Sequence, residues 1–114
     1  MVNRLGSWMV GGAMLVVASA ASATDPSIKC EADKLRLAAK YTACRLSEAA
    51  NAARSFGLPD YDSCVNSYLA GWSKAESRAR AKGAPCWTEG DAEVVKGDID
   101  SHTDSLAESL SGGK

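Results

Sequence analysis

The sequence predicts an all-α protein: a disulfide-tied antiparallel helical hairpin with a third, C-terminal helix. Apolar residues recur along it at steps of three and four, which is the period of a helix. Breaks at residues 57–60 and 83–85 divide these stretches into three. Four cysteines in a short chain that begins like an export signal indicate a disulfide framework. We therefore expect a small three-helix arrangement.

The first 23 residues have the three parts of a signal peptide. Arg4 supplies a positive charge, residues 8–18 are apolar, and small residues continue to Ala23. The apolar stretch is about half of the roughly 20 residues that a membrane-spanning helix needs, so we expect cleavage near Ala23 rather than retention. The prediction is an exported protein, periplasmic or extracellular, with one domain at residues 24–110 and a flexible tail at 111–114.

The first predicted helix covers residues 25–56, which are rich in Ala, Leu, Lys, Arg and Glu. Asp25 is suited to cap its start, with Pro26 at the first helical position. Two apolar stripes predict neighbours on two sides. One stripe has Cys30, Leu37, Tyr41 and Cys44, and the other has Ile28, Leu35, Ala39, Leu46, Ala49, Ala53 and Phe56.

Two further helices are predicted after Gly57, which is a natural C-terminal cap. The second runs over residues 60–82, where the steps between apolar residues are helical. The third begins near residue 88 or 91, and acidic residues favour that start. Its single narrow stripe consists of Ala92, Val95, Ile99, His102, Leu106 and Leu110.

Helix geometry restricts how the cysteines pair. Cys30 and Cys44 lie on one helix about 20 Å apart, beyond disulfide reach. The pairing is then either Cys30–Cys86 with Cys44–Cys64, or Cys30–Cys64 with Cys44–Cys86. A hairpin that turns near residue 58 favours the first pattern, although it fits Cys44–Cys64 less well than Cys30–Cys86. This misfit predicts that the first helix bends or ends before Phe56, or that the loop after it folds back.

The cysteines belong to a wider pattern of residues between positions 30 and 86. It consists of Cys30, Tyr41, Cys44, Pro59, Asp60, Tyr61, Cys64, Trp72, Ala75, Glu76, Gly83 and Cys86. This pattern resembles a cysteine-paired helical domain of exported, uncharacterised bacterial proteins. Because its motifs are structural, the resemblance implies a helical fold and no activity.

The charge of the mature chain is small but uneven. Twelve basic and 14 acidic residues after Ala23 give a net charge of −2, which argues against a general nucleic-acid binder. Residues 24–86 carry +3 and residues 87–114 carry −5. Either the last helix has a solvated acidic face, or the acidic segment docks on the basic part. We favour the first interpretation, because exposed ion pairs contribute little.

No catalytic, cofactor-binding or metal-ligating pattern is found in the sequence. A nucleophilic triad built around His102, the only histidine, would place every member on one helix, and triads need separate elements. Alternating acids near Asp98 lack the Gly and Glu of a calcium loop. The cysteine spacings contain no close ligand pair for zinc.

The remaining chemistry indicates surface recognition. We expect Trp72 in the core and leave Trp87 open, and we take Trp87 and His102 as a candidate interaction surface. The predicted function is a small exported, non-enzymatic binding module with a protein or envelope partner, without nucleic acid, and without membrane contact once the signal is removed. The alternatives are a structural or envelope-associated protein without a specific ligand, and an enzyme with an unrecognised site.

Overall fold

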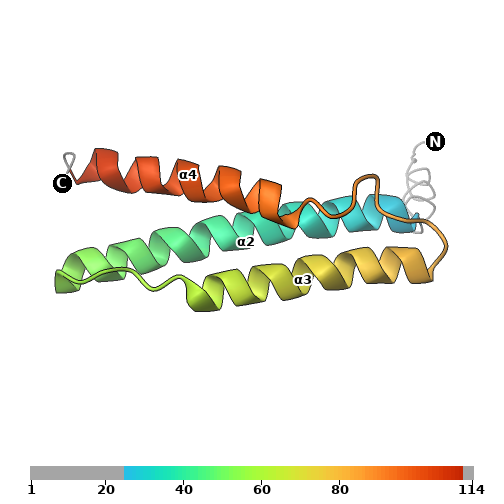
Figure 1. The fold of residues 1–114 in the computed structure, drawn as a ribbon, viewed down its shortest axis with the longest axis horizontal. Helices are drawn as coiled ribbons and strands as arrows, with labels where there is room; N and C mark the ends of the chain where they lie inside the picture. Colours follow the sequence, from blue (N-terminus) through green and yellow to red (C-terminus); the bar gives the residue numbers. More distant parts are fainter. Residues whose placement is uncertain (1–24, 112–114) are drawn as a thin grey trace, which may run out of the picture.

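The computed structural model describes residues 25–111, and within them it has three helices (Figure 1). They are α2 (Pro26–Ser55), α3 (Asp62–Ala81) and α4 (Ala92–Leu110). The helices α2 and α3 form an antiparallel hairpin, and α4 runs parallel to α2 on its other side (Figure 1). The predicted fold class is confirmed, and so are the two neighbours of the first helix. The expected signal peptide at residues 1–23 lies outside the described residues.

Local sequence determines where α2 begins and ends. The Asp25 carboxylate accepts a hydrogen bond from the Ser27 N–H at 2.9 Å, and Pro26 takes the first helical position, as expected. The expected cap at Gly57 is wrong by one residue. Phe56 itself has the left-handed conformation, with φ 57°, and the Gly57 N–H then bonds to the Ala52 carbonyl at 2.9 Å.

The disulfides join Cys30 to Cys86 and Cys44 to Cys64, which confirms the nested pairing. The first helix does end before Phe56, at Ser55, but one residue is too little to account for the misfit at Cys44–Cys64. The folded-back loop accounts for it. Residues 56–61 run back along the last turns of α2 before α3 begins (Figure 1). The end of α2 therefore extends beyond the hairpin. We call this end, with the 56–61 loop and the C-terminal end of α4, the distal end.

The core lies where the helices meet in the middle of the hairpin. It consists of Tyr41, Cys64, Tyr68 and Trp72, and the ring centroids of Tyr68 lie 4.7 Å from Tyr41 and 5.0 Å from Trp72. Trp72 is buried, as expected. A smaller cluster at the other end surrounds the Cys30–Cys86 disulfide. The two disulfides thus fix both clusters.

The apolar stripes predicted from the sequence are only partly buried. In the second stripe of α2, Leu35 and Phe56 are exposed. Phe56 follows α2 at the distal end, where α4 diverges from α2 (Figure 1). The predicted stripe of α4 contains His102, but the residue that is buried in the middle of the helix is its neighbour Thr103. The helix is rotated so that the Thr103 hydroxyl meets a polar group of α2.

Within residues 25–111, no helix is both long enough and apolar enough to cross a membrane.

Candidate functional site

A buried lysine joins the three helices near the start of α4. Lys34 of α2 is only 4% exposed, and its ammonium lies 2.9 Å from both Glu76 and Asp91. It also donates to the Thr88 carbonyl at 2.7 Å. Asp91 accepts further hydrogen bonds from the Trp72 indole at 3.0 Å and from the Thr88 hydroxyl. Each buried charge therefore has several partners, which is the condition for keeping it ionised.

The pKa values of this cluster follow from the balance of burial and hydrogen bonding. Burial alone would raise the pKa of Asp91, but hydrogen bonds from Thr88, Lys34 and Trp72 outweigh it and hold that pKa well below its ordinary value. Burial lowers the pKa of Lys34, and its bonds to Glu76 and Asp91 more than compensate and raise it. The hydrogen bonds thus favour the charged forms of both Lys34 and Asp91.

A second buried cation, Arg45, holds the middle of α4. Its Nε donates to the Thr103 hydroxyl at 2.7 Å, and its two terminal nitrogens lie 2.6 Å from Asp104 and 3.3 Å from Asp100. The guanidinium also stacks 3.8 Å from the centre of the Tyr61 ring. This combination of a fork of hydrogen bonds and an aromatic face suits arginine rather than lysine.

Both interpretations of the charge pattern hold for part of the acidic segment, because Glu93, Asp98 and Glu108 are exposed on α4 while other carboxylates pair with α2. The acidic segment docks on the basic part through two buried cations, Lys34 and Arg45. Neither residue was singled out from the sequence, because charged side chains are almost never fully buried. The sequence did indicate the burial of Lys34, because this residue lies four positions after Cys30 and three before Leu37, on the same face as the first apolar stripe.

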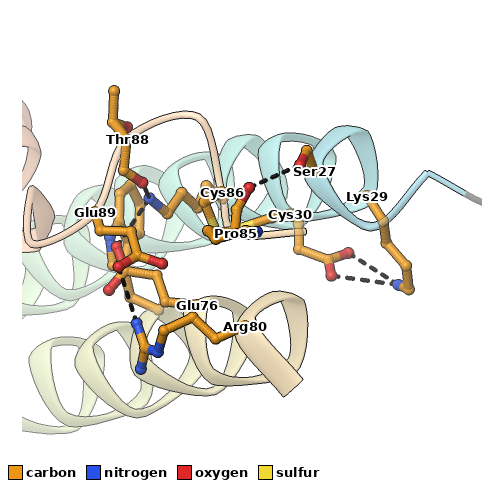
Figure 2. The surroundings of a disulfide bond; sticks show 12 residues. Ser27, Lys29, Cys30, Glu76, Arg80, Pro85, Cys86, Thr88 and Glu89 are labelled. Atoms are coloured by element: carbon orange, nitrogen blue, oxygen red, sulfur yellow. Dashed lines mark hydrogen bonds and ion pairs between the residues drawn. A yellow bond between two sulfur atoms is a disulfide. The ribbon is translucent and has the colours of Figure 1, made fainter. Parts of the chain in front are cut away.

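The loop between α3 and α4 is fixed to the start of α2 (Figure 2). Beside the Cys30–Cys86 disulfide, the Ser27 hydroxyl donates to the Pro85 carbonyl at 2.7 Å. Arg80 pairs with Glu89 at 3.1 Å, and the Gly90 N–H donates to Glu76. Trp87 projects from this rigid loop and is 66% exposed. Its position is compatible with the predicted interaction surface.

The two residues of the predicted interaction surface lie on different elements. Trp87 is in the loop before α4. His102 lies ten residues after Ala92, the first residue of α4, which corresponds to about 15 Å along the helix. His102 is exposed, and so are Ser101 and Ser105, the serines considered for a triad. The structure thus places these residues on the solvent side of one helix.

The apolar side chains with the highest exposed fractions lie at the distal end. Phe56 is 98% exposed and Leu58 is 94% exposed, both in the loop between α2 and α3. Beside them is a groove of about 380 Å³ between the end of α2, the loop and α4. Small residues and two carboxylates line it, among them Ala49, Ala52, Ala53, Ala107, Asp104 and Glu108. Apart from the place of Phe56 in the second stripe, sequence reasoning missed this region, because the left-handed turn at Phe56 is invisible in a helical pattern.

Among residues 25–111, no group of three or more His, Cys, Asp or Glu side chains is arranged to hold a metal ion. Both disulfides are closed, so the cysteines of this part of the chain carry no free thiol.

The fold and contacts define a small all-helical protein tied by two disulfides. No family model, curated protein or solved structure matches the chain. The disulfides suggest an oxidising, extracytoplasmic setting. Function has to be argued from the surface of this molecule alone.

Proposed function

We propose that the protein is an exported, non-enzymatic module that binds another protein through its distal end. The observation that carries the proposal is Phe56, an aromatic residue that is fully exposed and has a left-handed backbone. Both features work against folding. The left-handed conformation costs a residue with a side chain about 1–2 kcal/mol, and glycine avoids that cost. An exposed phenylalanine gains none of the stability that its burial would provide.

A residue that is unfavourable for the fold in two ways at once supports a role in binding. Aromatic side chains are typical anchors at the centres of protein interfaces, where a pocket of the partner buries them. Leu58 adds a second exposed apolar side chain two residues away. Together the two side chains supply a compact apolar contact on the loop between α2 and α3, the two helices that the Cys44–Cys64 disulfide joins.

The setting of the proposal is extracytoplasmic. The signal-like first 23 residues and the disulfides both support export. Trp87, at the opposite end of the hairpin, is a second candidate anchor, and His102 lies between the two on the outer face of α4.

Site-specific photo-crosslinking in the cells that make the protein tests the proposal. The variant Phe56→p-benzoylphenylalanine places the crosslinker at the proposed anchor. Ser105→p-benzoylphenylalanine is the matched control, because Ser105 is exposed on α4. We expect a discrete crosslinked partner from position 56 and none from position 105. Identical products from both positions, or none from either, would favour the structural alternative without a specific ligand.

A further inference from the structure

The groove between α2 and α3 has a charge opposite to that of the chain. Near the Cys30–Cys86 disulfide, two adjoining hollows share Asp33, Ala75 and Arg78 and form one continuous groove. The larger hollow has a volume of about 200 Å³. None of the residues that line these hollows belongs to α4. The groove is thus separate from both the ion networks and the distal end.

The rims of this groove are lined by exposed cations, three from α2 and three from α3 and the residue that follows it. They are Lys29, Arg36, Lys40, Lys74, Arg78 and Lys82. Asp33 is the one carboxylate among the lining residues, so six positive and one negative charge give +5, against −1 for the whole chain. Asp33 is paired with Lys29 and Arg36. The other four cations have no carboxylate partner among the described residues, which leaves their charge available.

The spacing of these cations suits a linear partner. Lys74, Arg78 and Lys82 are four residues apart, so they follow one another at about 6 Å along α3. Cys44 pairs with Cys64, and Gly71 lies against Leu37, so the two helices keep one register over this stretch. In that register the cations span about 20 Å of the groove, from Lys82 to Lys40. A row of this kind matches a chain of repeated negative charges better than a single anion.

The lining also discriminates among polyanions. The described residues that line these two hollows include no aromatic ring. The next hollow along the groove shares Leu37 and Lys40 and reaches Tyr41 and Tyr68, but each of these tyrosines is only 2% exposed. Single-stranded nucleic acids are bound largely by stacking on accessible rings, which this groove does not offer. The described lining residues also include none of the large exposed apolar side chains with which a protein inserts into a membrane surface. The floor is apolar and shallow, with Leu37, Gly71 and Ala75 between the charged rims. An acidic sugar chain has carboxylates for the rims and carbon–hydrogen faces for such a floor.

We infer that the α2–α3 groove binds a linear acidic polysaccharide. Carboxylates of the polymer pair with the cations on the two rims, and the sugar faces lie along the apolar floor. The site is independent of the distal end, so the protein would join a protein partner to an acidic polymer.

Titration calorimetry of the oxidised protein with polygalacturonate, a linear polymer of carboxylated sugars, tests this inference. The groove variant is Lys40→Gln with Arg78→Gln, which removes from each rim one of the four cations that pair with no carboxylate of the described residues. The matched control is Arg54→Gln with Arg80→Gln, which removes two exposed arginines outside the groove and changes the net charge equally. Thermal melts of both variants, expected within about 3 °C of the parent, confirm that they fold.

We expect the parent to bind in 50 mM salt, with an affinity that falls as salt rises. The groove variant should bind at least tenfold more weakly, and the control should stay within twofold of the parent. Equal weakening in both variants would overturn the inference, because binding would then follow net charge alone. The absence of binding to polygalacturonate would overturn it as well. Equally tight binding to oligo(dT) or to vesicles containing phosphatidylglycerol would assign the groove to a different partner and also refute the inference.

Discussion

Replacing the buried lysine by an apolar residue of similar length should unfold the junction of the three helices. In Lys34→Met the ammonium that joins Glu76, Asp91 and the Thr88 carbonyl is lost. Glu76 then keeps only the Gly90 N–H among its contacts, and its carboxylate stays largely buried. Asp91 keeps its bonds from Thr88 and Trp72, which limits the damage on that side.

The expected loss in free energy of unfolding follows from these contacts. Removing one partner of a buried ion pair costs about 3–5 kcal/mol, because the remaining charge is left without compensation. Since Asp91 keeps two donors, we expect about 3 kcal/mol for this variant. For a domain of this size 1 kcal/mol corresponds to about 4–8 °C, so the melting temperature should fall by at least about 12 °C.

Thermal unfolding followed by circular dichroism measures this loss in the oxidised protein. Lys29→Met is the matched control, because Lys29 lies on the same helix in an exposed pair with Asp33. It should lower the melting temperature by less than about 3 °C. Adding Glu76→Gln to Lys34→Met should recover part of the loss, since the unpaired buried charge is then removed. A melting temperature for Lys34→Met within about 3 °C of the parent would refute the reasoning.

Two further predictions concern the crosslinks and the response to pH. Removing one disulfide with Cys44→Ala and Cys64→Ala should lower the free energy of unfolding in urea by about 3 kcal/mol, and an unchanged midpoint would contradict this. The pKa of Asp91 is held below its ordinary value, so its stabilising contribution is complete above about pH 4 and is lost as the pH falls through the folded value. In urea unfolding at pH 6, the free energy of unfolding of Asp91→Asn should therefore be clearly lower than that of the parent. The difference between the two free energies should shrink toward pH 2. A difference that stays constant with pH would show that Asp91 contributes no pH dependence.

Helix positions and cysteine pairing were accessible from the sequence for physical reasons. Two cysteines on one helix cannot reach each other, so only two pairings remained, and the hairpin register selected between them. Asp25 and Pro26 marked a helix start that depends on local geometry alone. These features needed no knowledge of the tertiary contacts.

The docking of α4 was not accessible in the same way. An isolated acidic segment gives no sign of which cations will be buried beneath it, and the burial of Lys34 and Arg45 depends on contacts nearly sixty residues away in the chain. The same limit applied to His102 and Thr103, because one step of helix rotation decides which of them faces α2. The rotation is fixed by the bond between Arg45 and the Thr103 hydroxyl.

The exposure of the distal end could not be predicted from the sequence for a different reason. Phe56 continues the apolar period of α2, so the pattern predicts a buried residue. The chain instead turns at this residue and runs back along α2, which leaves the ring in solvent. The failure of a sequence rule at one residue is itself informative, because such failures are expected at functional positions.

The substitution Phe56→Gly tests the central claim most directly, because it separates folding from binding. Glycine removes the cost of the left-handed backbone, although it gains freedom in the unfolded chain, so a net gain of about 0.5–1 kcal/mol is expected. The measurement combines thermal melting with crosslinking from Leu58→p-benzoylphenylalanine, with and without Phe56→Gly. The account predicts a melting temperature higher by about 2–8 °C and loss of the crosslinked partner. An unchanged crosslink in the stabilised variant would contradict it.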